Sequence, residues 1–466
     1  MSDNMVTFRT RQGLELRGTL HGLTRNQVAF ETYGPEPVLR VSEVLTDFTL
    51  RHYDQPIYSG KALVSNLVQT GSYTICEAHL DDTWIDGRTL PFGTEPAQAK
   101  VSFNQFMEQW SKTYRILPEF KAVMADTHSF LLDLRTWLEQ IELTIRSTPG
   151  GSRALLERQW LEALTPDTTA AIANLFDRFE RVAATVEPEF LPAHQAFGRR
   201  MLHPLILAAP FVYRTLQKPL GYAGDYEMVN MIVRDPYEGA TLFAKVFNVC
   251  ALSRPPIVAH RNRLQYLANK LQEETLRKLA KAERTKILVI GCGPAHEIRT
   301  FLRDQASSDR VDFTLVDFDA ETLEHTAQAL TALKKTHGRA TRFELVKKSV
   351  QQLLKQSAKL AASNAGEKYD FIYCAGLFDY LPDPVCRSLI GLFDNLLTPG
   401  GVQIVTNVDQ HSSRREMEYF LEWHLIYRDT KAMEALIPPR VPAENVFVFR
   451  EPSGINIFVE IRKAEA

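Results

Sequence analysis

The residues best suited to bind a ligand form a glycine-rich turn in the second half of the chain. An apolar run, Ile287–Ile290, leads directly into Gly291-Cys292-Gly293-Pro294-Ala295-His296-Glu297. A short apolar run bounded by glycines is typical of a strand buried on both faces of a parallel sheet. Glycines let the backbone approach a bound molecule closely, because they carry no Cβ. Residues 297–302 have helical character, and strand, turn and helix together are typical of nucleotide- or nucleoside-binding α/β domains.

The segments that follow supply the elements that must position this turn. Asp317 ends a second apolar run about 26 residues after Gly291, where an acid suits ribose hydroxyls. Three further strands are predicted at residues 343–346, 369–374 and 402–406, the last preceded by the turn Pro399-Gly400-Gly401. Residues 445–450 and 455–460 predict a closing β-hairpin. The fold class predicted for this half is α/β and Rossmann-like.

The order and spacing of these features over about residues 255–463 resemble the class I methyltransferases that use S-adenosylmethionine. The resemblance implies that the glycine turn passes under the methionine end of the cofactor and that Asp317 takes the ribose hydroxyls. The cofactor site implied is Gly291, Cys292, Gly293, Pro294, Ala295, Glu297, Asp317, Phe318, Ser349, Val350, Cys374, Ala375, Gly376, Tyr226 and Arg214. Dinucleotide dehydrogenases are disfavoured, because His296 occupies the last glycine position of their Gly-x-Gly-x-x-Gly motif.

Two positions depart from the family. Ala295 stands where a third glycine is frequent, and alanine is small enough to keep the backbone close. Ser349 stands where an acid often binds the adenine amine, and its hydroxyl could accept that bond. Cys374, at the end of the fourth strand, lies near the cofactor by position or is simply a small buried apolar residue.

A second informative stretch, Lys218–Glu227, lies ahead of the first core strand, where class I methyltransferases place a lid over the cofactor. Two glycines, two tyrosines and an acid within six residues indicate a shaped loop. Tyr222, Asp225 and Tyr226 are therefore candidate catalytic residues facing the methionine group or the acceptor, with Arg214 near the cofactor carboxylate. The alternative is a tight turn whose tyrosines fill the gap between a helical domain and the sheet.

Methyl transfer from a sulfonium chiefly requires alignment of the nucleophile in a dry pocket. A carboxylate acceptor needs no base at neutral pH, whereas a hydroxyl or ammonium does. His411 follows a predicted strand and is the best candidate base, with a capping or surface histidine as the alternative. His296, Asp379 and Tyr380 are expected to border the acceptor pocket, although His296 could instead satisfy backbone groups in the first turn of its helix.

The composition indicates a protein of two or three domains that works in a reducing cytoplasm. The chain has 466 residues, a net charge of −2 and five scattered cysteines without CxxC or Cys/His spacing, so no metal site is expected. The near-zero net charge disfavours nucleic acid as a partner. Residues 1–5 lack the apolar core of a signal peptide, and the longest apolar window, residues 205–212, is too short to span a bilayer.

Residues 1–95 alternate apolar and polar side chains in short runs, which predicts a small β-barrel. The segment resembles PilZ domains, which bind cyclic di-GMP, but Gly22–Gln27 matches the family's second motif only at Thr24. Arg9, Arg11 and Arg17 lack the family's spacing. We therefore disfavour cyclic di-GMP as a ligand and favour a structural or protein-contact barrel.

Residues 96–208 change to a helical period, broken at residues 147–152, which predicts a helical hairpin. Its aromatic stripe is expected to be core, with part of it available as a homodimer seam. The predicted domains are therefore 1–95 (barrel), 96–208 (helical), 209–254 (lid segment) and 255–466 (class I methyltransferase).

The function predicted is transfer of a methyl group to an O or N atom of a small molecule. The arrangement is similar to bacterial methyltransferase-like proteins described as making methyl esters of 3-hydroxy fatty acids, which implies a carboxylate acceptor and a helical layer that shelters its acyl chain. Two alternatives stay open. One is a PilZ-type signalling protein whose methyltransferase fold binds a cofactor or partner without turnover, and the other is a protein methyltransferase.

Overall fold

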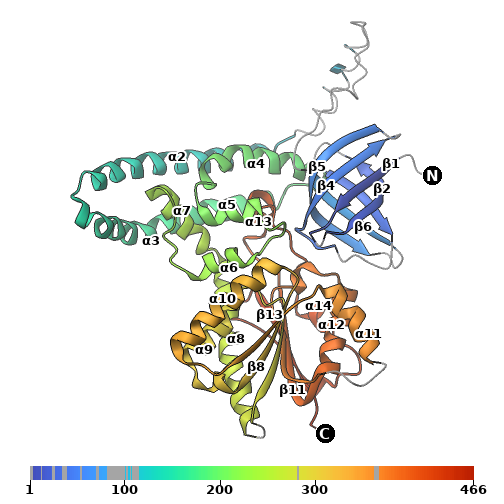
Figure 1. Ribbon diagram of the computed structural model, residues 1–466. Helices are drawn as coiled ribbons and strands as arrows, with labels where there is room; N and C mark the ends of the chain where they lie inside the picture. The colour runs from blue at the N-terminus through green and yellow to red at the C-terminus, as the bar shows by residue number, and fades with distance from the viewer. Residues whose placement is uncertain are drawn as a thin grey trace.

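The computed structural model describes residues 4–11, 13–23, 27–33, 39–52, 55–69, 73–80, 115–280, 283–361 and 367–465, with residues 100, 103, 104 and 107 (Figure 1). A barrel, a layer of helices and an α/β domain follow one another along the chain. The predicted boundary at residue 95 and the Thr24 position of the PilZ-like motif lie outside the described residues.

The N-terminal part is a closed, six-stranded antiparallel barrel in the order β1-β2-β3-β6-β5-β4. Its strands are β1 (Asn4–Arg9), β2 (Glu15–Leu23), β3 (Gln27–Tyr33), β4 (Val44–His52), β5 (Gln55–Gln69) and β6 (Tyr73–Leu80). Alternate side chains fill the interior, where Phe8, Phe30 and Phe48 contact one another. The predicted small barrel is confirmed, and PilZ-like ligand binding stays a prediction.

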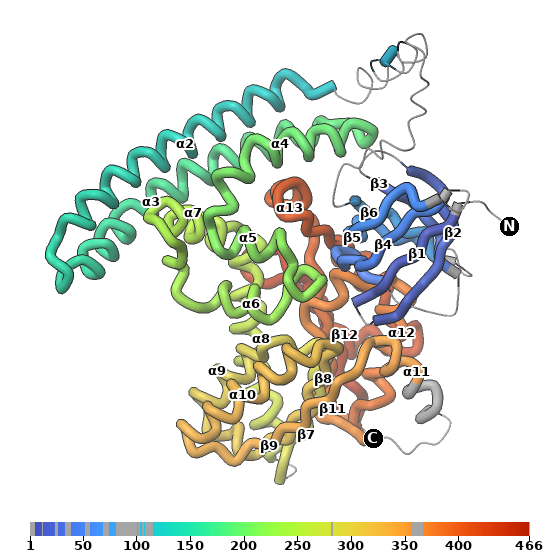
Figure 2. Tube along the Cα trace, turned by 45° about the horizontal axis from the view of Figure 1, so that its top comes forward, coloured from blue at the N-terminus to red at the C-terminus, as the bar shows by residue number. Residues whose placement is uncertain are grey.

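The middle part is built on the long hairpin of α2 (Pro118–Arg146) and α3 (Gly150–Ala183), seen at the far end from the barrel in Figures 1 and 2. It continues with α4 (Leu191–Ile206), α5 (Pro210–Gln217), α6 (Tyr226–Val233) and α7 (Leu242–Leu252), with a 3-10 turn at Pro188–Phe190. Phe120, Phe176 and Phe179 are buried in its core. Trp137 and Leu143 are exposed, at 44% and 65%, and a dimer seam there stays a prediction.

The C-terminal part is a seven-stranded sheet in the order β12-β13-β11-β10-β7-β8-β9. Its strands are β7 (Thr285–Ile290), β8 (Val311–Asp317), β9 (Arg342–Lys347), β10 (Tyr369–Cys374), β11 (Leu397–Val408), β12 (Val446–Arg450) and β13 (Asn456–Arg462). Strands β7 to β11 are parallel, and the hairpin β12–β13 adds antiparallel to β11. The predicted strands and closing hairpin are confirmed.

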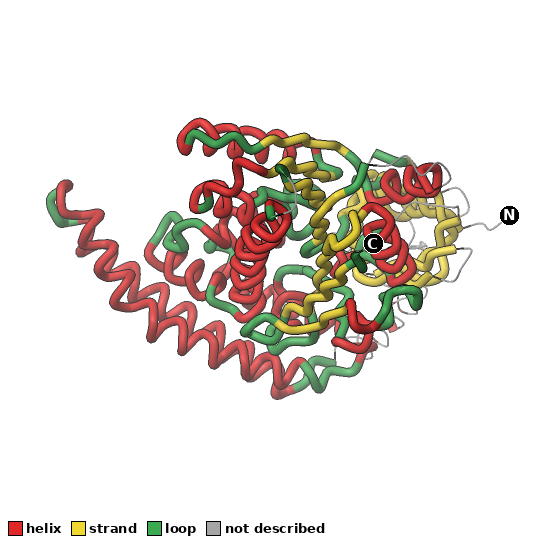
Figure 3. Tube along the Cα trace, turned by 90° about the horizontal axis from the view of Figure 1, so that it is seen from below, coloured by secondary structure: helices red, strands yellow, loops and turns green. Residues whose placement is uncertain are grey.

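Two layers of helices cover this sheet, and the strands lie between them in Figure 3. The helices of this part are α8 (Pro255–Leu279), α9 (His296–Asp304), α10 (Ala320–His337), α11 (Val350–Ala361), α12 (Asp383–Leu396), α13 (Arg414–Phe420) and α14 (Thr430–Glu434). Helices α8, α9 and α10 pack on one face and α11, α12 and α14 on the other, whereas α13 packs on α3 and α4 of the middle part.

The aromatic-rich residues 417–427 suggest one helix by their sequence, but α13 ends at Phe420. Glu422 has a positive φ of 47°, which helical residues do not adopt, and the Trp423 N–H turns back to the Met417 carbonyl at 3.0 Å. Tyr419 and Phe420 then pack against Phe179 in the helical layer. This short helix therefore ties the middle part of the chain to the α/β domain (Figure 2).

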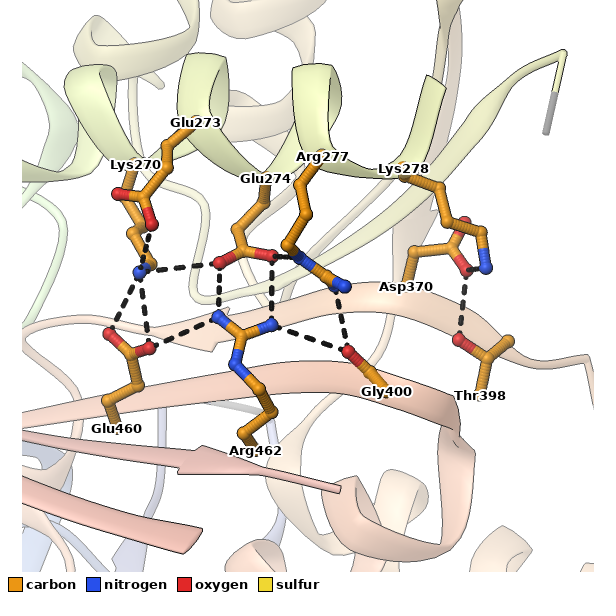
Figure 4. A network of polar contacts seen from close by, with 10 residues as sticks. All are labelled: Lys270, Glu273, Glu274, Arg277, Lys278, Asp370, Thr398, Gly400, Glu460 and Arg462. Atoms are coloured by element: carbon orange, nitrogen blue, oxygen red, sulfur yellow. Dashed lines mark hydrogen bonds and ion pairs between the residues drawn. The ribbon is translucent and has the colours of Figure 1, made fainter. Parts of the chain in front are cut away.

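Helix α8 is held to the sheet by a charged network at the edge where parallel strands begin (Figure 4). Glu274, with 1% of its side chain exposed, accepts hydrogen bonds from Arg277 at 2.7 Å and from Arg462 on β13 at 2.5 Å. Lys270 pairs with Glu274 and Glu460. Burial alone would raise the pKa of Glu274, but the bonds from both arginines lower it to about 2.

Replacing Glu274 with glutamine is expected to lower the free energy of unfolding by about 3 kcal/mol at neutral pH, because the buried Lys270 and the half-buried Arg277 and Arg462 all lose this carboxylate. In the unmodified protein this contribution is present above pH 4.5 and is lost as the pH falls through about 2, since the depressed pKa means that only the ionised form is stabilised. Urea unfolding at neutral pH and at about pH 3 tests this, and the difference between the two proteins should narrow at the lower pH.

A matched control is Glu273→Gln, one residue away in the same helix. Glu273 is 62% exposed and pairs only with Lys270 among the network residues in Figure 4. Its replacement should cost less than about 1 kcal/mol. Equal losses for the two variants would contradict the role given to Glu274.

Among the described residues, no single helix has both the length and the apolar composition needed to cross a membrane. Helices α7 and α8 meet that length and composition only when they are counted together, and they are bent by 64°.

Candidate functional site

The sheet order reverses between β7 and β10, and a crevice forms at such a point beyond the carboxyl ends of the strands. The glycine turn enters this crevice with positive φ at Gly291 (68°), Gly293 (50°) and Ala295 (51°). A Cβ placed on Gly293 would meet no atom within 4 Å, so its backbone faces open space. Ala295 adopts the left-handed conformation, which glycine adopts most easily. This conformation explains why a third glycine is frequent at this position in the methyltransferases that the sequence resembles.

Asp317 ends β8 beside this turn, and backbone groups hold its carboxylate. Gly293 N–H donates to one oxygen and Asp319 N–H to the other, both at 3.1 Å. Burial raises the pKa of Asp317, and these two backbone bonds oppose that rise. Each carboxylate oxygen keeps a lone pair for another donor. Asp319 caps α10 by accepting from Thr322 N–H at 2.9 Å.

A central cavity of about 190 Å³ opens above the turn. Most of the residues predicted for the site line it: Gly291, Cys292, Gly293, Pro294, Ala295, His296, Glu297, Asp317, Phe318, Val350, Ala375, Gly376, Asp379, Tyr380, Tyr222 and Tyr226. Ser349, Cys374, Asp225, Arg214 and His411 are not among its lining residues. The structure therefore brings the first set to one cavity and leaves the second set outside its walls.

Four of the residues outside the cavity have local contacts of their own. Arg214 donates to Asp225 at 3.0 Å, and Asp225 caps α6 by accepting from Met228 N–H at 2.8 Å. These contacts hold the lid segment in shape. Ser349 accepts from Gln352 N–H at 3.2 Å at the start of α11. Burial raises the pKa of the Cys374 thiol well above its usual value.

His411 lies outside the cavity with its Nδ1 accepting from Ser413 N–H at 3.2 Å. Burial lowers its pKa to about 4. Its Nε2 is buried without a hydrogen-bond partner among the described residues. A base role for His411 stays a prediction, since no contact joins it to the cavity wall residues named above.

The lid tyrosines reach across to the end of β8. The Tyr222 ring lies 5.0 Å from the Phe318 ring, and its hydroxyl is 3.4 Å from the Thr322 hydroxyl. Tyr226 donates to Glu321 at 2.9 Å. His296, whose pKa burial lowers to about 4, contacts Asn230 at 2.8 Å. The predicted lid segment thus contacts the end of β8 and the start of α10 beside the cavity, and its role as a lid stays a prediction.

Further lining residues come from elements that the sequence analysis did not connect with the site. Arg263 and His260, on α8, lie on the wall, with 3.1 Å between Arg263 Nη2 and His260 Nδ1. Gly376 has a φ of 84°, which favours glycine, and a Cβ there would lie 2.7 Å from Arg263 Nη2, so the guanidinium lies directly against this glycine. Trp423 donates to the Tyr380 hydroxyl at 2.9 Å, and Arg40 enters from the barrel.

A smaller apolar cavity of about 70 Å³ adjoins the central cavity from the helical layer. The two share Pro256, Ile257, Met417 and Trp423 as lining residues. Its other walls are almost wholly apolar and include Phe176, Phe247 and Ala251 of the helical layer, with Arg254 and Glu416 paired to each other at 2.9 Å. Among the described residues, no group of three His, Cys, Asp or Glu could hold a metal ion.

Residues 288–403, about a quarter of the chain, match the family described as a methyltransferase domain. No curated protein sequence matches the chain. Similar solved structures include a possible exported protein from Bordetella parapertussis, at 18% identity and TM-score 0.43, covering 64% of this chain and 97% of that one. Another is magnesium protoporphyrin IX methyltransferase from Synechocystis PCC 6803, at 10% identity and a TM-score of 0.35. That likeness covers 51% of this chain and 94% of the other chain. The N-methyltransferase NodS from Bradyrhizobium japonicum WM9 is similar at 14% identity and a TM-score of 0.28. That likeness covers 43% of this chain and 97% of the other chain.

The identities and TM-scores of these structures are low. The class of the C-terminal part therefore follows from the family match and from the strand order of the sheet. The matched residues run from β7 into β11 and contain the glycine turn and Asp317. The C-terminal part of the chain is therefore a methyltransferase domain of class I, carrying a barrel and a helical layer on its N-terminal side.

Proposed function

We propose that this protein transfers a methyl group from S-adenosylmethionine to a carboxylate oxygen of a small molecule with an apolar tail. The observation that carries this proposal is the apolar cavity, which adjoins the central cavity and shares four residues with it. A polar reacting group would lie in the central cavity while its tail extends between the helices. Burying such a tail contributes about 0.8 kcal/mol per methylene.

The residues around the central cavity fit S-adenosylmethionine, whose sulfonium makes the methyl group reactive. Asp317 has lone pairs free for the two ribose hydroxyls, and the open face of Gly293 admits the cofactor next to the turn. At the other end, the Arg263 guanidinium lies beside Gly376 and His260 and would hold the methionine carboxylate. Arg263 takes the role predicted for Arg214, which Asp225 already engages.

Among the titratable groups of the cavity, the two imidazoles favour an acceptor that is already anionic, whereas burial raises the pKa of the Glu297 and Asp379 carboxyls. A hydroxyl or ammonium acceptor needs a base whose pKa lies near the operating pH. Burial lowers the pKa of His296 to about 4 and that of His260 well below its usual value, so neither imidazole is well matched to that task. Glu297 accepts from the Tyr373 hydroxyl at 2.7 Å, and Asp379 from Val408 N–H at 2.6 Å. A carboxylate nucleophile requires only that the chain align it and exclude water.

The test is turnover with matched acceptors of one chain length. The purified protein, S-adenosylmethionine and 3-hydroxydecanoate should yield S-adenosylhomocysteine and the methyl ester, detected by mass spectrometry. The corresponding amide and 1,3-diol should yield neither product. Methylation of the diol but not of the acid would overturn the carboxylate assignment, and failure to bind S-adenosylhomocysteine in calorimetry would overturn the cofactor assignment.

A further inference from the structure

The barrel contributes Arg40 and Val41 to the wall of the central cavity, and the charged one of the two is Arg40. It stands in a docking turn, residues 39–43, which lies between the barrel and the lid segment. Glu43 fixes the turn by accepting from the backbone N–H groups of Arg40 and Arg11, each at 3.1 Å. Val44 N–H donates to the Gly221 carbonyl at 2.9 Å, and the Ser42 hydroxyl donates to the His424 carbonyl at 3.0 Å. The docking turn is thus joined to both the lid and the α/β domain.

The side chain of Arg40 is buried near the carboxylates of Glu43 and Asp317, and its charge opposes the rise that burial causes in the pKa of each, but it lies within ion-pair distance of no described residue. The residue is 9% exposed, its Nε has no hydrogen-bond partner among the described residues, and no ion pair joins it to any of them. Its guanidinium lies over the Phe318 ring, 4.4 Å from the centroid. A cation–π contact compensates only part of the cost of burying a charge. A buried guanidinium that faces a cavity is therefore poised for an anion supplied by a ligand.

The cavity offers two buried guanidiniums, Arg40 and Arg263, which come from different domains. S-adenosylmethionine carries a single carboxylate, and the proposed function assigns that group to Arg263 beside Gly376. Arg40 stacks on Phe318, and its charge also opposes the rise that burial causes in the pKa of Tyr380, a residue expected to border the acceptor pocket. Of the other cations that line the cavity, Arg40 is buried and Lys348 is only half-buried, so Arg40 is the buried cation left for the second ligand.

We infer that Arg40 binds an anionic group of the methyl acceptor, a carboxylate or a phosphate, so that the barrel determines which acceptors the methyltransferase domain accepts. This inference rests on the proposed function. It gives the barrel a role in acceptor specificity that needs no ligand of its own. Arg40 is a binding residue of the acceptor, and its removal should weaken acceptor binding without changing cofactor binding.

The test uses full-length protein saturated with S-adenosylhomocysteine, with decanoate, decyl phosphate and the neutral decanamide as probes in calorimetry. One of the two anions should bind, and decanamide should bind at least about tenfold more weakly, since a charged hydrogen-bond partner is lost. Arg40→Met should lower the affinity for that anion by about 30-fold and leave S-adenosylhomocysteine affinity within about twofold. Arg40→Lys should restore part of the anion affinity, because it keeps the charge but not the planar fork.

The matched control is Arg11→Met, in the same barrel and at the same interface. Arg11 pairs with Asp319 at 2.9 Å but does not line the cavity, so anion affinity should stay near that of the unmodified protein. Equal losses in Arg11→Met and Arg40→Met would show that docking of the barrel, not the Arg40 side chain, matters. The inference is also overturned if Arg40→Met binds the anion normally, if it loses S-adenosylhomocysteine in parallel, or if unmodified protein that binds S-adenosylhomocysteine binds neither anion. Lack of S-adenosylhomocysteine binding by the unmodified protein would instead overturn the proposed function.

Discussion

Replacing Asp317 with alanine is expected to lower the affinity for S-adenosylhomocysteine by about a hundredfold. Two ribose hydroxyls would lose a charged acceptor, and hydrogen bonds to charged groups contribute about 1.5–3 kcal/mol each. Asp317→Asn keeps one acceptor oxygen, so its affinity for S-adenosylhomocysteine should fall by only about tenfold. Because burial raises the pKa of Asp317, protonation should weaken binding at a higher pH than the usual value of 3.8 would suggest. Calorimetric titration across the acid range measures both effects.

The control for this prediction is Asp312→Ala, at the opposite end of the same strand. Asp312 pairs with Arg284 at 2.8 Å and does not line the central cavity. Its replacement should leave the affinity unchanged, and thermal unfolding of both variants without ligand reports any general loss of stability. If Asp317→Ala folds and binds S-adenosylhomocysteine as tightly as Asp312→Ala, the cofactor site is misplaced.

The part of the site predicted from the sequence is the part whose signals are local. The apolar run before Gly291 and the run that ends in Asp317 lie on adjacent parallel strands, so their ends meet at one edge of the sheet. The position of each follows from its strand alone. The cap of α10 by Asp319 is a local signal of the same kind, because a capping residue needs only the residues just after it.

The contributions of the other domains could not be predicted in this way. Arg40 reaches the cavity because Ser42, with a positive φ of 61°, shapes a turn that hydrogen-bonds to a segment nearly 400 residues away. No local pattern distinguishes Arg40 from the other arginines of the barrel. Arg214 is the opposite case. Its position near the lid segment suggested that it binds the cofactor carboxylate, but in the structure it forms an ion pair with Asp225 instead. Pairings of this kind depend on tertiary structure.

Filling the apolar cavity is expected to exclude long acceptors and spare short ones. Ala251, near the end of α7, lines this cavity and is not among the residues of the central cavity. A phenylalanine there would occupy the space proposed for the acceptor tail. Each buried methylene contributes about 0.8 kcal/mol, so kcat/KM of the unmodified enzyme should rise about fourfold per methylene while the tail fits. Losing three methylenes of burial corresponds to about 2.4 kcal/mol, or roughly fifty-fold.

The measurement is kcat/KM for a homologous series of 3-hydroxy carboxylates with the series Ala251→Val, Ala251→Leu and Ala251→Phe. The chain length at which the rise ends should shorten as the side chain grows, because each larger side chain removes more of the space for the tail. Activity toward the shortest acids should persist and serves as the internal control for folding and cofactor binding. If all lengths fall together, the substitution has damaged the fold, and the graded valine and leucine variants then decide the question. An unchanged length profile in variants that remain folded would mean that the acceptor tail lies elsewhere, and the apolar cavity would be only a packing gap between the helical layer and the methyltransferase domain.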